Sequence, residues 1–95
     1  MEKKEAYQEK MEAQLKEWNA KIEKLKAKAQ QASAAAKIQY QEQIEALRTK
    51  YDAAQAKLRE LRTAGEGAWG DLKAGMESAW NELKNAWEIA VSKLK

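Results

Sequence analysis

The apolar residues in the first two thirds of this chain recur with heptad spacing. From Met11 to Ala36 they alternate by four and three positions, and a second run extends from Ile44 to Leu61. This spacing places them on one stripe of a helix and is typical of coiled coils. The stripe residues expected to mediate self-association are Met11, Leu15, Trp18, Ile22, Leu25, Ile44, Leu47, Leu58 and Leu61.

The heptad pattern slips in the segment 30–37, QQASAAAK, where the large apolar residues are missing. A stutter inside one continuous helix would produce such a slip. A turn is the alternative, because Ser33 could cap the start of a second helix. Alanine, glutamine and lysine are good helix formers, and the segment contains no Gly, Pro or Asn. We therefore favour a long coiled-coil helix over residues 1–64 and keep a turn at 30–37 as the competing interpretation.

The last part of the chain, residues 68–95, repeats every eleven residues and has one strongly apolar face. Such a face needs a cover, which can be this chain, a second copy, a different protein or a lipid surface. Its four lysines and four acidic residues give no net charge, so attraction to anionic lipid is weak and a protein cover is favoured. The residues of this partner or lipid face are Trp69, Leu72, Met76, Trp80, Leu83, Trp87, Val91 and Leu94.

Glycines separate this amphipathic segment from the heptad region. Gly65 and Gly67 predict a hinge over residues 65–67, since a glycine here can take the left-handed conformation that ends a helix. Residues 37–64 and 68–95 are equally long, which fits two arms of an antiparallel hairpin. An unbroken helix through the hinge is the alternative, because the apolar stripe keeps its phase there.

Composition supports an all-α fold. The 95 residues include no Pro, no Phe, four Gly and 35% charged residues. The fold class that we predict is a long heptad helix followed by a C-terminal amphipathic helix, arranged as a helical hairpin or a three-helix bundle. A chain this short builds a thin core, so we also expect a homo-oligomer.

Most catalytic and metal-binding chemistry lacks its usual side chains here. The chain has no His and no Cys, and its acidic residues alternate with lysines. We therefore expect no catalytic residues, metal site or cofactor, and no enzyme activity. The lysines of 21–28 are spread around a helix with no nucleic-acid motif, so no nucleic-acid partner is expected. The charged N-terminal stretch and the lack of a long apolar run predict no signal peptide and no transmembrane segment, so we expect a cytoplasmic protein.

Nearly the whole chain resembles a family of small bacterial coiled-coil proteins. The resemblance is carried by MEAQLKEWNAKIEKLKAK, KIQYQEQIEALRTKYDAAQAKLRELR and GAWGDLKAGMESAWNELKNAW. It implies a soluble helical bacterial protein and transfers no activity or site residue. The eleven-residue repeat is also loosely similar to the amphipathic helices of apolipoproteins and late-embryogenesis proteins, which lie on lipid.

These observations lead to one functional expectation and one alternative. We expect a non-enzymatic structural or interaction protein, a self-associating coiled coil that acts as a scaffold or accessory subunit. The alternative is a peripheral protein that binds lipid or membrane surfaces through residues 68–95.

Overall fold

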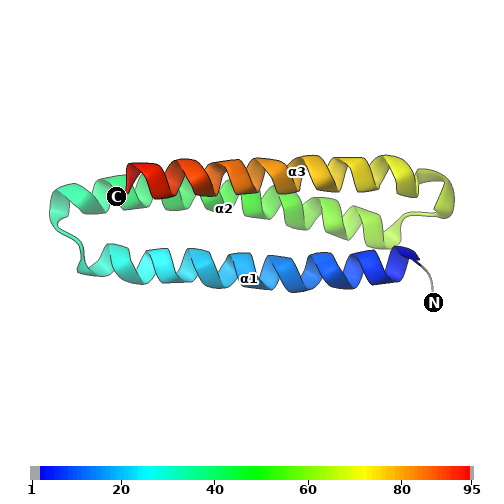
Figure 1. The fold of residues 1–95 in the computed structure, drawn as a ribbon, viewed down its shortest axis with the longest axis horizontal. Helices are drawn as coiled ribbons and strands as arrows, with labels where there is room; N and C mark the ends of the chain where they lie inside the picture. Colours follow the sequence, from blue (N-terminus) through cyan, green and yellow to red (C-terminus); the bar gives the residue numbers. More distant parts are fainter. Residues whose placement is uncertain (1–2, 95) are drawn as a thin grey trace.

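The chain folds into three helices that run up, down and up. The computed structural model describes residues 3–94, with α1 at Lys3–Gln31, α2 at Ala34–Thr63 and α3 at Glu66–Lys93. They form a bundle that measures 50 × 19 × 17 Å (Figure 1). The α1–α2 turn and the end of α3 lie at one end, called the Ser33 end. The start of α1 and the α2–α3 turn lie at the other, called the Gly65 end.

The chain turns at Ala32 and Ser33. The Ser33 hydroxyl accepts a hydrogen bond from the Ala36 amide at 3.3 Å, and the Ser33 carbonyl accepts one from the Lys37 amide at 2.8 Å. The favoured continuous helix over residues 1–64 is therefore wrong, and the alternative turn with Ser33 as the helix cap is confirmed. Folding back lets the stripe of α1 pack on the rest of the chain, and this burial outweighs the local helix propensity of the alanines.

The second turn lies where the glycines predict it, but its backbone conformation differs from the expected one. Ala64 and Gly65 both have extended backbone, and no residue between 3 and 94 has a positive φ. The expected left-handed glycine is thus not used. Gly67 lies within the first turn of α3, so the break is confined to residues 64 and 65, and the unbroken helix is excluded.

All three helices contribute to one core. The largest side chains with no appreciable exposure are Ile22 from α1, Leu47 and Leu61 from α2, and Met76 and Leu83 from α3. Each large apolar side chain covered in this way contributes roughly 1.5–3 kcal/mol of burial free energy before entropy is counted. The apolar stripes of the sequence therefore close on one another inside a single chain, and the all-α bundle is confirmed.

Helices α2 and α3 pack antiparallel in a register that two contacts define. Lys50 Nζ lies 2.8 Å from Glu82 Oε1, and the methylene chain of Lys57 lies opposite Gly75. These pairs are seven residues apart on both helices. One further heptad along, the same register places Gln43 of α2 level with Ile89 of α3.

The start of α1 is bound to the α2–α3 turn at the Gly65 end. The Lys4 ammonium donates a hydrogen bond to the Ala64 carbonyl, and the Gln8 amide donates one to the Leu61 carbonyl at 3.4 Å. Both carbonyls lie at the end of α2, where the regular i+4 helical donors run out and Leu61 accepts instead from the Ala64 amide at 3.3 Å. The two side chains supply further donors to these carbonyls and join the start of α1 to this turn.

The Ser33 cap makes a testable contribution to stability. Ser33→Ala removes the side-chain acceptor for the Ala36 amide and should lower the free energy of unfolding by about 1 kcal/mol in urea denaturation. Ser33→Asp keeps an acceptor at the cap and should unfold at the same urea concentration as the wild type or a higher one. Equal midpoints for the alanine and aspartate variants would show that the cap does not hold the turn.

Candidate interaction surfaces

The predicted self-association stripe lies in the core of the single chain. Eight of its nine residues are buried there, and the ninth, Ile44, is half-buried beside α1. A second chain could reach these side chains only if the bundle opened. The buried members of the stripe are Met11, Leu15, Trp18, Ile22, Leu25, Leu47, Leu58 and Leu61.

The predicted partner or lipid face of α3 is also largely covered by the chain itself. Met76 and Leu83 are fully buried, whereas Val91 is exposed. The other members of this face are half-buried and pack at the edge of the core. They are Trp69, Leu72, Trp80, Trp87 and Leu94.

Aromatic rings connect α1 to α3. Tyr7 packs edge-to-face on Trp69, with ring centroids 5.9 Å apart, and Trp18 packs in the same manner on Trp80 and Trp87 at 6.1 and 5.6 Å. The backbone of α2 approaches both of its neighbours closely, whereas α1 and α3 meet mainly through these rings. We call the five residues the aromatic seam. Edge-to-face pairs of this kind add roughly 0.5–1.5 kcal/mol each to their area burial.

Two lysines lie over the aromatic seam. Lys21 Nζ is 4.4 Å from the ring centroid of Trp18 and 5.5 Å from that of Trp87. Lys73 Nζ is 5.2 Å from the Tyr7 ring and 5.3 Å from the Trp69 ring. The ammonium groups interact with the ring faces, and the alkyl stems cover apolar surface. The seam is therefore shielded by cations of the same chain.

Two polar atoms of the seam are buried without a hydrogen-bond partner among the described residues. They are Tyr7 Oη and Trp69 Nε1, which belong to two rings that pack edge-to-face at the Gly65 end. Burial raises the pKa of the Tyr7 hydroxyl, and the nearby Glu77 carboxylate raises this pKa further. An unpaired buried hydroxyl costs stability, so this part of the core is suboptimal.

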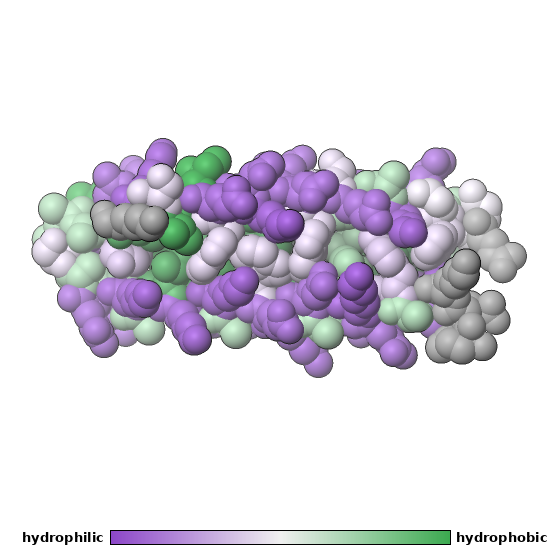
Figure 2. All heavy atoms as spheres, in the orientation of Figure 1, coloured by the Kyte–Doolittle hydropathy of each residue, from purple (hydrophilic) through white to green (hydrophobic). Residues whose placement is uncertain are grey.

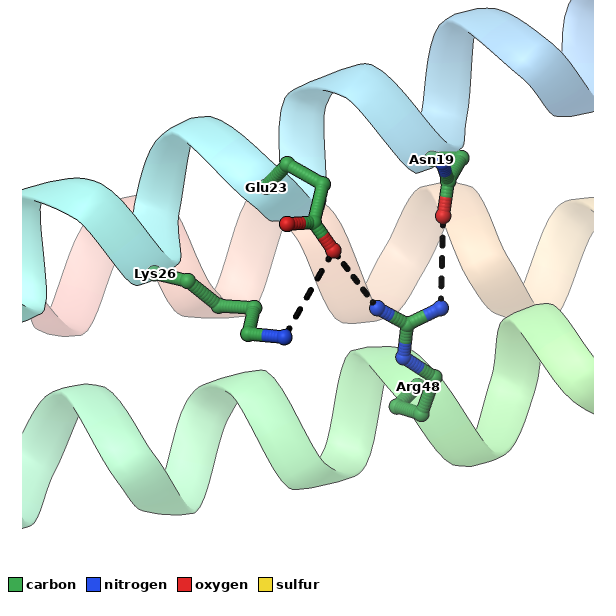
Figure 3. A network of polar contacts seen from close by, with 4 residues as sticks. All are labelled: Asn19, Glu23, Lys26 and Arg48. Atoms are coloured by element: carbon green, nitrogen blue, oxygen red, sulfur yellow. Dashed lines mark hydrogen bonds and ion pairs between the residues drawn. The ribbon is translucent and has the colours of Figure 1, made fainter.

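A polar network connects α1 to α2 (Figure 3). The Glu23 carboxylate lies 3.2 Å from the Arg48 guanidinium and 3.5 Å from the Lys26 ammonium, and Arg48 also donates to the Asn19 side-chain oxygen at 3.3 Å. Exposed ion pairs of this type contribute little free energy. These contacts identify the side of α2 that faces α1.

An open groove of about 370 Å³ follows this network toward the Ser33 end, between α1 and α2. We call it the α1–α2 groove. It exists because Ala29 supplies only a methyl group where larger side chains fill the rest of the core. Its lining combines apolar Ala29 and Ile44 with Lys26, Gln30, Lys37, Gln41 and Glu45.

Large apolar side chains are exposed near the Ser33 end. Ile38 near the start of α2 is 61% exposed, and Ile89 and Val91 near the end of α3 are 53% and 37% exposed. On the face drawn in Figure 2, hydrophilic residues dominate, and the most hydrophobic colour is concentrated toward this end. The fold does not bury these side chains, which makes this end the most apolar candidate for contact with another molecule.

Between residues 3 and 94 there is no cluster of three or more metal-ligating side chains, and no helix in that range has the length and apolarity to cross a membrane. The Glu82 carboxyl has a lowered pKa because Lys50 donates a hydrogen bond to it and attracts its negative charge. This exposed pair joins α2 to α3.

Comparison of the chain with protein families, with characterised proteins and with solved structures finds no match. The resemblance to small bacterial coiled-coil proteins and to lipid-binding repeats therefore stays a prediction.

Sequence reasoning missed several residues of these surfaces. Tyr7 lies four positions before Met11, so extending the heptad spacing upstream would have included it. Ile38 and Ile89 lie off the periodic stripes, and their presence on otherwise polar helix faces is the signal that could have identified them. The positions of Lys21 and Lys73 over rings depend on how α1 and α3 pack together. A local sequence pattern does not predict that packing.

The unpaired Tyr7 hydroxyl predicts an unusual effect of a conservative substitution. Tyr7→Phe keeps the ring on Trp69 and removes the hydroxyl, so the variant should be at least as stable as the wild type at neutral pH. Because the folded pKa is raised, ionisation of Tyr7 is less favourable in the folded state than in the unfolded state. Wild-type stability should therefore be unaffected by this group below its ordinary pKa of about 10 and should fall as pH rises through the folded pKa. Denaturation curves above pH 10 should therefore show a steeper loss in the wild type than in Tyr7→Phe. Tyr40→Phe serves as a control, and parallel pH profiles for the wild type and Tyr7→Phe would contradict the assignment.

Proposed function

We propose that the protein is a non-enzymatic interaction protein that self-associates as folded bundles and acts as a scaffold or accessory subunit. The observation that carries the proposal is the exposure of Ile38 and Ile89 near the same end of a bundle whose other large apolar residues are mostly covered. Aliphatic side chains on an otherwise polar surface favour contact with another apolar surface. A cytoplasmic location in a bacterium belongs to the same proposal and rests on the sequence resemblance.

The exposed side chains also indicate how strong the association should be. Stable interfaces bury roughly 800 Å² on each partner. A few isolated exposed isoleucines are a small apolar contact by comparison, so the association should be weak. The core is complete within one chain, so a monomer can fold alone. We therefore expect a reversible dimer whose population depends on protein concentration.

Mass measurements over a concentration series test this proposal. Sedimentation equilibrium from micromolar to millimolar protein should show a monomer that converts into a dimer. Ile89→Lys should shift the conversion to higher concentration, because it places a charge where an apolar contact is expected. Ala13→Lys, on the outer face of α1, is the matched control and should leave it unchanged. A monomer throughout the series would refute self-association.

A lipid-surface function for α3 remains the second candidate. The observation that favours it is the row of half-buried tryptophans on α3. Aromatic side chains of α1 contact these tryptophans, but the backbones of α1 and α3 do not pack closely. Separation of α1 from α3 would present those rings to lipid, where tryptophan is favoured. Lys21 and Lys73 already occupy the ring faces, however, and residues 68–95 carry no net charge. Self-association is therefore the better-supported function.

Vesicles distinguish the two candidates. If α3 binds lipid, tryptophan emission should be quenched by brominated phospholipid in vesicles, and the wild type should co-sediment with them. If the bundle stays closed, emission and sedimentation should be the same with anionic vesicles, with zwitterionic vesicles and with none. Co-sedimentation of a monomeric protein would favour the lipid function over self-association.

A further inference from the structure

The turn between α1 and α2 consists of residues that a helix also accepts. We propose that two copies of the chain exchange their first helices. In the exchanged dimer Ser33 and its neighbours straighten, α1 and α2 form one long helix, and α1 of each copy packs on α2 and α3 of the other. This mode of association goes beyond contact between folded bundles and does not depend on the exposed isoleucines.

The first step is the conformation of the turn. Ser33 has φ −64° and ψ 164°, so at this residue only ψ departs from helical geometry. The segment 30–37 contains no Gly and no Pro, and no residue between 3 and 94 has a positive φ. Core contacts and the Ser33 cap therefore hold the turn, and none of its residues would be excluded from a helix.

The second step is the rotational phase of the two helices. Ile22 of α1 and Leu47 of α2 are both fully buried and lie 25 residues apart, which is about seven turns of a helix. Glu23 and Arg48, which join α1 to α2 in Figure 3, have the same separation. In one straight helix the inner sides of α1 and α2 therefore point the same way to within about 20°. Each long helix then offers one continuous side to a second copy.

The third step is the register. Contacts between α1 and α2, such as Glu23 with Arg48 and Gln8 with Leu61, join residues at nearly equal distances from Ala35. Two straight antiparallel helices reproduce this register when a two-fold axis passes between them at the level of Ala35, perpendicular to both. The residues next to Ala35 on either side are alanines, so no large side chain lies at the axis.

The third helix does not obstruct the exchange. The contact of Lys50 with Glu82 sets the register of α2 and α3, and this register places Lys93, the last residue of α3, level with Gln39. Each α3 therefore ends before the axis and stays on its own α2. The core contacts are the same in both forms, so their free energies differ at the turn and in the entropy of association. The dimer reopens only when α1 leaves the core, which makes it persist on dilution.

Crosslinking between different chains tests the exchange, because the protein has no cysteine of its own. Glu23→Cys and Arg48→Cys chains are mixed, unfolded in urea, refolded at millimolar concentration and treated with a short bismaleimide. A covalent dimer that contains both chains is expected, since α1 of one copy then contacts α2 of the other. A mixture of Lys50→Cys and Glu82→Cys is the matched control. It should give no mixed dimer, because α2 and α3 remain in the same chain.

A proline at the start of α2 provides an independent test. Ala34 is the first residue of α2, where proline is well accepted, and Ser33 already has the extended backbone that a following proline favours. In the straight helix the same proline would lie in the interior, which disfavours that helix about a hundredfold for each chain. Ala34→Pro should therefore abolish the dimer formed on refolding and keep a folded monomer. Ser33→Ala, which removes the cap of the turn, should increase the dimer fraction.

The outcomes separate this proposal from association of folded bundles. A dimer that persists on dilution, crosslinks between Glu23 and Arg48 of different chains and is lost in Ala34→Pro supports the exchange. A dimer that dissociates on dilution, responds to Ile89→Lys and is unaffected by Ala34→Pro overturns the exchange and leaves association of folded bundles intact. A protein that stays monomeric after refolding at millimolar concentration overturns both.

Discussion

The structure depends on one constraint, which is that the apolar stripes of three helices must share one narrow core. Ile22 from α1, Leu47 from α2 and Leu83 from α3 are fully buried only because the other two helices cover each of them. An isolated helix with such a stripe would leave it in water. The two turns follow from this requirement, since the chain must reverse after about 30 residues for equal helices to align, a length of about 45 Å at the helical rise.

The sequence pattern predicts the helices and most of the core, but it does not decide the first turn. Local propensity at Ala34, Ala35 and Ala36 favours continued helix, and Ser33 provides only a weak signal for a cap. What decides the turn is the packing of Trp18 against Trp80 and Trp87, residues more than sixty positions away. Burial between distant residues leaves no signal in a local window of sequence, so helix propensity alone predicts the wrong conformation here.

The candidate surfaces were harder to predict than the core for a related reason. Periodicity identifies the residues that share a stripe, but not whether another chain or the same chain covers it. Leu15 and Leu58 would support a coiled coil of two chains equally well, and in this fold they lie in one chain's core. The residues left exposed, Ile38 and Ile89, contribute nothing to the periodic pattern. Their exposure is evident only in the folded structure.

The two ends of the bundle differ in how they are packed, and this difference bears on function. At the Gly65 end, Tyr7 and Trp69 fill the space between α1 and α3, and Lys4 binds the end of α2. At the Ser33 end, the core narrows to small residues such as Ala29 and Ala90, which fill less of the space between the helices.

Ala29 supplies little volume to the core at the Ser33 end and leaves the α1–α2 groove open, whereas the rings of Tyr7 and Trp69 close the Gly65 end. Ile38 and Ile89 are exposed at the same end as the groove, off the stripes that form the core. The groove and the isoleucines together place uncovered apolar surface at the Ser33 end. This surface is the physical reason that association is expected there and not along the charged faces of the bundle.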